Sequence, residues 1–219
     1  MMKRVIAAIL LAAPFGVLPA MDNEHDRGRE LVDEFVGDVV TFRGDFQQVL
    51  LDPDNQVIER TAGSLEISRP GKFRWTYVEP YEQWLLADGL NIWSYDVDLA
   101  QVTVKPQVEA LANTPALLLG GSGDALDQFS YEGSYDEIET TWVKLVTHDT
   151  TSVFMRVELG FIDDTLRRMV FFDNLEQTTL VEFRDVAVNE PIDDQRFAFD
   201  IPADVDVVGT PAVAVVPDP

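Results

Sequence analysis

The sequence contains no cysteine and only two histidines. The absence of cysteine excludes disulfides, thiolate metal sites, a nucleophilic thiol and the acylated cysteine that anchors a bacterial lipoprotein. His25 and His148 are the only side chains whose ordinary pKa lies near neutrality, and no Ser/His/Asp arrangement has local support around either. We therefore expect neither an enzyme nor a metal or cofactor site.

Lysine is also scarce, since four of the 16 basic residues are lysine, whereas aspartate and glutamate together number 39. The resulting net charge of −23 repels nucleic acid and anionic membrane surfaces. Such a charge favours a protein that stays in solution as a monomer. An acidic surface with little lysine also fits an organism that lives in high salt, where charge repulsion is screened.

Long apolar runs are missing after the first 20 residues. Residues 1–20 combine a basic start, an apolar run and a small residue at Ala20, which is typical of a secretory signal peptide. The apolar run is shorter than the roughly 20 residues that cross a bilayer. We expect residues 21–219 to form a single exported domain with a flexible tail from about residue 209. Removal of the signal leaves 14 basic and 39 acidic residues, a net charge of −25.

Aromatic residues are concentrated between residues 68 and 101, which hold three of the four tryptophans. Phe73, Trp75 and Tyr77 alternate with polar residues, a pattern that predicts a strand with one aromatic face. A hairpin through an Asp-Gly turn follows. A face with this much aromatic surface must pack against helices or line an apolar cavity, because an exposed one would drive association.

The pattern of the rest of the chain predicts mostly strands separated by turn residues. Strands are expected at residues 41–51, 56–68, 84–87, 91–95, 99–105, 139–148, 152–161, 165–173 and 178–188. Within residues 152–161, the alternation places on one face Met155, Val157, Leu159 and Phe161. Residues 22–40 predict an amphipathic helix that packs on the sheet, with helical spacing of Leu31, Phe35, Val36, Val39 and Val40. The fold class is mainly β with a few helices.

Residues 107–129 interrupt the strands with few β-branched residues. Asn113 and Thr114 suit a helix start, Pro115 lies just inside it, and residues 116–119 form an apolar turn before a Gly-Gly stop. Spacing alone leaves open whether this is a buried connecting helix. Its position between strands favours a lid over the aromatic face, with a hinge at residues 120–123.

Arg69 stands immediately before Pro70, where the aromatic strand begins. Its guanidinium has five donors, which suffice to bond helix or loop carbonyls across a cavity mouth. An ordinary surface arginine whose stem lies on an aromatic ring is the alternative, and the residues alone leave both open.

Two acidic pairs, Asp163-Asp164 and Asp193-Asp194, are the remaining candidates for a cation site. They lack the alternating oxygen-ligand spacing of a calcium loop. In a chain this acidic, we interpret them as solvated turns.

Several segments together resemble the LolA family, the periplasmic outer-membrane lipoprotein carriers of Gram-negative bacteria. The resemblance rests on RPGKFRW at residues 69–75, ADG at 87–89, DLAQ at 98–101 and NTPALLL at 113–119, with Leu90, Trp93 and Tyr95. It implies an incomplete antiparallel β-barrel, or curved sheet, covered by a lid of short α-helices that encloses a hydrophobic cavity. It also implies a chaperone that takes acylated lipoproteins from an inner-membrane ABC-type release complex to an outer-membrane receptor.

The resemblance assigns roles to individual residues. Arg69 is similar to the arginine that holds the helical lid shut. The residues that the resemblance places around the acyl chains are Phe73, Trp75, Trp93, Pro115, Ala116, Leu117, Leu118 and Leu119.

Three other functions compete with a carrier. The outer-membrane receptor resembles the carrier in architecture but needs an acylated cysteine, which is missing here. A periplasmic module that senses lipids or lipoproteins and regulates a membrane partner resembles the first domain of longer proteins, and this length leaves no room for the second. A lipid-modifying enzyme lacks a nucleophile with a base.

Overall fold

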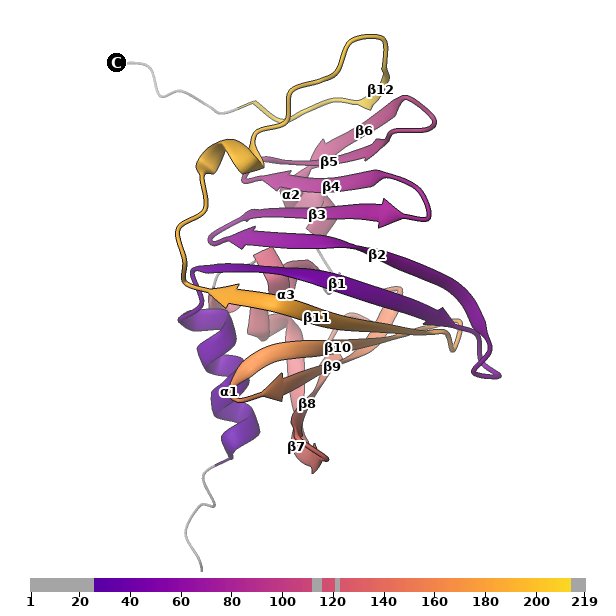
Figure 1. The fold of residues 1–219 in the computed structure, drawn as a ribbon. Coiled ribbons are helices and arrows are strands. Elements are labelled where there is room, and N and C mark those ends of the chain that lie inside the picture. Colours follow the sequence, from indigo (N-terminus) through magenta and orange to yellow (C-terminus); the bar gives the residue numbers. More distant parts are fainter. Residues whose placement is uncertain (1–25, 112–115, 121–122, 214–219) are drawn as a thin grey trace, which may run out of the picture.

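The computed structural model describes residues 26–111, 116–120 and 123–213, and shows one strongly curved sheet with helices on its concave side (Figure 1). Twelve strands follow the order β12-β6-β5-β4-β3-β2-β1-β11-β10-β9-β8-β7. Because β7 and β12 form the two edges, the sheet curves like a barrel without closing. The mainly β fold class predicted from the sequence is confirmed.

Two antiparallel meanders meet where β1 pairs with β11. The first meander consists of β1 (Thr41–Leu51), β2 (Val57–Ser68), β3 (Lys72–Glu79), β4 (Gln83–Asp88), β5 (Asn91–Asp96) and β6 (Gln101–Pro106). The second consists of β7 (Phe129–Glu137), β8 (Thr140–Thr147), β9 (Phe154–Ile162), β10 (Thr165–Asp173) and β11 (Thr178–Val188), and β12 (Asp206–Gly209) pairs in parallel with β6.

The helical elements are short. They are α1 (Arg27–Gly37), α2 (Gln107–Leu111), α3 (Ala116–Gly120) and the 3-10 turns η1 (Gly123–Gln128) and η2 (Asp194–Phe197). Among the helices within the described ranges, none is long and apolar enough to cross a bilayer.

Helix α1 is shorter than the helix predicted over residues 22–40. The Asp26 carboxylate caps its start by accepting a hydrogen bond from the backbone N–H of Arg29. The helix ends at Gly37, and Val40 lies beyond it with 55% of its surface exposed. Val39 also lies beyond the helix and is half-buried, whereas Leu31, Phe35 and Val36 are buried in it as predicted.

One strand face also differs from its prediction. Val157, Leu159 and Phe161 of β9 are buried, as their alternation indicates, but Met155 is 52% exposed. In the pairing of β9 with β10, Arg156 faces Phe172 and Phe154 faces Asp173, so Met155 is an extra residue at a bulge. A bulge removes one residue from the alternation, and the sequence does not mark its place.

The C-terminal segment covers the convex face of the sheet. Turn η2 contacts β3 and β4, and β12 extends the sheet beyond β6. Further on, Ala212 exchanges two hydrogen bonds with the Asn91 side chain, at 2.7 and 3.1 Å. The flexible tail predicted from about residue 209 stays a prediction, and residues 214–219 lie outside the described residues.

Candidate functional site

The aromatic strand lines the concave face. Alternate residues of β3 point to the same side of the sheet, and there Phe73 pairs with Ile67 and Trp75 pairs with Leu65 of β2. Phe73 has no exposed surface and Trp75 has 7%. The Trp75 ring lies 5.0 Å from Phe46, centroid to centroid. This face forms one continuous apolar core with the second meander, as the alternation of the sequence indicates.

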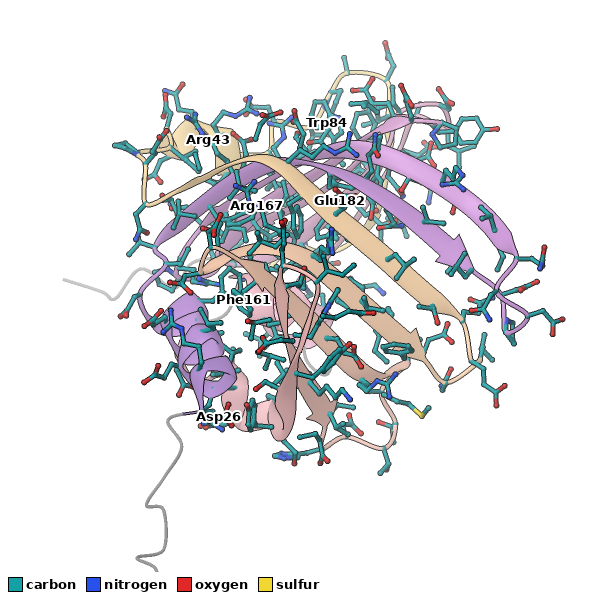
Figure 2. All side chains as sticks on the ribbon, turned by 60° about the horizontal axis from the view of Figure 1, so that its bottom comes forward. Asp26, Arg43, Trp84, Phe161, Arg167 and Glu182 are labelled. Atoms are coloured by element: carbon teal, nitrogen blue, oxygen red, sulfur yellow. The ribbon has the colours of Figure 1, made fainter. Side chains whose placement is uncertain are left out.

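Helix α1 closes one part of the concave face. The Phe35 ring meets Phe42 of β1 and Phe161 of β9 edge-on, at centroid distances of 6.3 and 6.2 Å. Figure 2 shows Phe161 beneath the arch of the sheet, beside α1, with Asp26 at the start of that helix. The Asp26 carboxylate accepts hydrogen bonds from Tyr131 and Ser134 of β7. These contacts attach α1 to both halves of the concave face.

Helix α3 closes the part of the face above Phe73. Its Leu118 and Leu119 side chains are 0% and 1% exposed and belong to the concave core. A Cβ atom on Gly120 would lie 2.8 Å from the Phe73 ring, so the helix end touches the sheet more closely than any side chain permits. Gly120 is thus a point of close packing, and the hinge predicted over residues 120–123 stays a prediction, since residues 121 and 122 lie outside the described residues.

For two of the predicted lid residues, the structure describes the backbone and not the side chain. Ala116 and Leu117 lie in this helix, and their side chains are outside the described part of the structure. Pro115 lies outside the described residues altogether. The backbone of α3 therefore agrees with the predicted apolar turn over residues 116–119.

Arg69 connects the two helices to the sheet. Its Nη1 donates to the carbonyls of Phe35 and Val39 at 2.6 Å each, at the end of α1 and just beyond it. Its Nη2 and Nε donate to the carbonyls of Leu118 and Leu119 in α3, at 2.9 and 3.2 Å. Carbonyls in the last turn of a helix lack partners within the helix, so a guanidinium with five donors satisfies several of them at once. The structure thus selects the carbonyl-bonding alternative over an ordinary surface arginine.

The Arg69 guanidinium also stacks over the Phe35 ring, 4.6 Å from its centroid. Burial lowers the pKa of Arg69 to about 10, which leaves the side chain charged at neutral pH. Its backbone N–H donates to Val40, and the neighbouring Gly71 N–H donates to Gly120. A single segment at the start of β3 therefore holds the ends of α1 and α3 together.

Trp93 does not lie with the other predicted cavity residues. Through the register of β3, β4 and β5, Trp93 faces Leu86 and Leu86 faces Arg74, so it points to the convex side. There its ring stacks on Phe199 at 5.0 Å and its Nε1 donates to Asp88. The prediction that Trp93 lines the cavity was wrong. The alternation of β5 shows which residues share a face, but it does not show which face is concave. The residue that covers Trp93, Phe199, comes from a distant part of the chain.

The apolar face opens at its far end into a hollow of about 450 Å³. Tyr77 lines this hollow and stacks on Trp75, so the aromatic wall under the helices continues into it. Thr61 lines it as well, and the carboxylates along it belong to Glu59, Glu79, Asp96 and Asp98. Sequence reasoning missed this site, because its residues come from separate strand ends and turns that only the curved sheet assembles.

The other candidates have structural roles. The Nε2 of His148 lies 2.8 Å from the Ser130 hydroxyl on an exposed strand end. Asp164 pairs with Arg27, Asp193 caps η2, and Asp194 pairs with Lys72. Asp164, Asp193 and Asp194 therefore have structural contacts of their own.

The arrangement of sheet and helices defines a class of protein. A curved open sheet with an apolar concave face, closed by helices that one arginine ties down, is typical of a protein that binds an apolar ligand.

Comparison with known proteins gives the family. The sequence matches the model described as outer membrane lipoprotein carrier protein LolA over residues 37–200. It is 39% identical over 175 residues to the outer-membrane lipoprotein carrier protein of Nitrosomonas europaea, covering 80% of this chain and 85% of that protein. It is 40% identical over 187 residues to the protein of the same name in Nitrosospira multiformis, covering 84% and 89%. The chain belongs to the LolA family, which confirms the resemblance found in the sequence.

A solved structure shares the fold. An uncharacterized conserved protein from Thermus thermophilus superposes with a TM-score of 0.51 at 16% sequence identity, covering 83% of this chain and 96% of that one. At this identity the likeness concerns the fold alone.

Proposed function

We propose that this protein is a periplasmic carrier that holds the acyl chains of lipoproteins against its concave face. It takes them from an inner-membrane ABC-type release complex and delivers them to an outer-membrane receptor. The observation that carries the proposal is the Arg69 cluster, in which one side chain ties two helices over an apolar face. Residues 1–20 direct export and residues 21–219 form the carrier domain, without enzymatic activity.

The physical need for such a carrier follows from hydrophobic transfer. Each methylene moved out of water is worth about 0.8 kcal/mol, so one acyl chain of roughly 16 carbons gains on the order of 10 kcal/mol on burial. A lipoprotein with bare chains therefore does not cross an aqueous compartment alone. The concave core of this protein offers an apolar surface of the required kind.

Release requires that part of this burial energy be offset. In this structure Phe73, Leu118 and Leu119 are at most 1% exposed, so the space under the helices is filled by packed side chains. Acyl chains enter only when α1 and α3 move away, which breaks the Arg69 hydrogen bonds. The closed lid thus raises the free energy of the loaded state relative to the empty one, and this difference drives the transfer to the receptor.

Specific residues carry the binding. Phe73 and Trp75 on the sheet contact the chains, and Leu118 and Leu119 on α3 face them from the lid. Pro115, Ala116 and Leu117 complete the lid. Trp93 is excluded from this set because it lies on the convex face.

The test is a release assay. Purified protein is added to spheroplasts or inner-membrane vesicles that contain the release complex, and the supernatant is examined for outer-membrane lipoproteins in a soluble complex with it. Appearance of this complex supports the carrier, and a receptor in outer-membrane vesicles should then accept the cargo. If no lipoprotein is released although the release complex is active with another carrier, the proposal fails and a lipid-sensing module becomes the better hypothesis.

A further inference from the structure

Two polar atoms of the concave face have no hydrogen-bond partner among the described residues: Trp75 Nε1 and Thr61 Oγ1. The Trp75 side chain is deeply buried, with 7% of its surface exposed. A buried donor without an acceptor is destabilising, and native proteins usually satisfy such groups. An unsatisfied indole N–H in an otherwise apolar wall therefore needs an explanation.

Among the described residues, none accepts a hydrogen bond from Trp75 Nε1. The rings packed around it are Phe46, Tyr77 and Phe183, all within 6.5 Å between centroids. By contrast, the indole N–H of Trp93 on the convex face donates to a carboxylate of Asp88 at 2.7 Å. The same sheet thus satisfies a buried indole on one face and leaves one unpaired on the other.

The two unpaired atoms lie along one path on the concave face. Trp75 stacks on Tyr77, and Tyr77 and Thr61 both line the hollow of about 450 Å³. Thr61 lies on β2 opposite Gln48, another residue of this hollow. The path therefore runs from beneath the lid to the open end, and the unpaired polar atoms mark positions along it.

We propose that Trp75 donates its indole N–H to an acyl carbonyl of the bound lipid, with the Thr61 hydroxyl as a second donor nearer the hollow. This inference rests on the proposed function and specifies which part of the ligand is recognised. A hydrocarbon chain has no acceptor, whereas the ester or amide that joins it to the rest of a lipid has one. The empty protein keeps the donor unpaired, and the ligand satisfies it.

The consequence is selectivity for acyl linkages over alkyl linkages of equal length. The probes are the palmitoyl ester of glycerol and the hexadecyl ether of glycerol, each measured by equilibrium binding to the purified protein. The wild-type protein binds the ester about tenfold more tightly than the ether, because the ether lacks the carbonyl and its own oxygen is a weaker acceptor. Trp75→Phe reduces this ratio towards one, because phenylalanine keeps the ring and removes the donor.

The control is Trp142→Phe, since Trp142 is equally buried at 8% exposed but stacks on Tyr135 outside the concave core. This variant keeps the wild-type ester-to-ether ratio. Thr61→Val removes the second donor, a hydroxyl, with little change of shape and lowers the ratio by a smaller factor. In NMR spectra of the wild-type protein, the resonance of the Trp75 indole N–H shifts when the ester is added and does not shift when the ether is added.

Each outcome bears on a different claim. The role of Trp75 is overturned if the wild-type protein binds both probes equally. It is also overturned if Trp75→Phe keeps the wild-type ratio and the indole resonance does not shift. Neither result contradicts the proposed carrier function. Failure of the wild-type protein to bind either probe counts against the apolar site itself, and so against the proposed function.

Discussion

At the scale of single residues, Arg69 explains why this chain needs an arginine at the start of its aromatic strand. Three carbonyls from two helices, and that of Val39 just beyond α1, converge on one planar guanidinium, which also stacks on Phe35. A lysine ammonium has three donors at one point and does not span them. The position of Arg69 next to Pro70 was visible in the sequence, whereas its acceptors, 30 to 50 residues away, were not.

Arg69→Leu is expected to load lipoprotein and to transfer it poorly. The closed lid loses its hydrogen bonds, so the free energy of unfolding falls by about 2–4 kcal/mol and the loaded state gains relative to the empty one. Transfer to the receptor should slow by about tenfold or more. Urea denaturation and a release-and-transfer assay measure the two effects. Arg60→Leu, which changes an exposed arginine of β2, is the control. Normal transfer by Arg69→Leu would refute the gating role.

At the scale of elements, the end of α3 lies close against the sheet because Gly120 has no side chain there. Gly120→Ala places a methyl group 2.8 Å from the Phe73 ring, which has no exposed surface and no room to retreat. The helix should move outward, lowering the free energy of unfolding by about 1–3 kcal/mol. We expect stronger binding of an apolar fluorescent dye in the absence of lipid.

Gly37→Ala supplies the matched control for this change. Gly37 ends α1, and an added Cβ meets nothing within 4 Å. Alanine there should leave dye binding unchanged. It should raise the free energy of unfolding by about 0.5 kcal/mol, because it lowers the conformational entropy of the unfolded chain. Equal dye binding by Gly120→Ala and the wild type would contradict close packing as the reason for this glycine.

The start of α1 depends on a charge. The hydrogen bond from Tyr131, together with those from the Arg29 backbone and Ser134, lowers the pKa of Asp26 below its ordinary value of 3.8. A carboxyl group with a lowered folded-state pKa stabilises the protein above its ordinary pKa, and this contribution is lost as the pH falls through the lowered value.

Asp26→Asn tests this dependence because asparagine keeps the acceptor oxygen and removes the charge. We expect the variant to be less stable than the wild type by roughly 0.5 kcal/mol at neutral pH. The difference should shrink as the pH falls below 3.8 and vanish below the lowered pKa of Asp26. Denaturant midpoints across the pH range provide the measurement. A difference that stays constant at all pH values would exclude the charge as its cause.

At the scale of the whole molecule, net charge opposes the compact state. The net charge is −23, or −25 without residues 1–20. Repulsion among these charges should lower the free energy of unfolding at low ionic strength. The screening length falls from about 30 Å at 0.01 M salt to about 3 Å at 1 M. We expect potassium chloride to raise the free energy of unfolding by about 1–2 kcal/mol across this range. Equal stability at both salt concentrations would reject a high-salt adaptation.

Much of the architecture was readable from the sequence. The strands at residues 41–51, 165–173 and 178–188 have the predicted bounds, because turn residues lie near their ends. Phe73 and Trp75 lie on the apolar face that their alternation indicates. The bulge at Met155 and the early end of α1 escaped prediction, since backbone irregularities depend on partners that the local pattern does not contain.

The sequence by itself determined the strands, the residues that share a face, the charge and the family, since these follow from local alternation, composition and motifs. The tertiary structure decided which face becomes concave, where the helices attach, and what covers each face. Trp75 and Trp93 illustrate the difference: both alternate within aromatic strands, yet one lies under the lid and the other under Phe199. Alternation is a property of one strand, whereas curvature and cover arise from contacts between segments far apart in the chain.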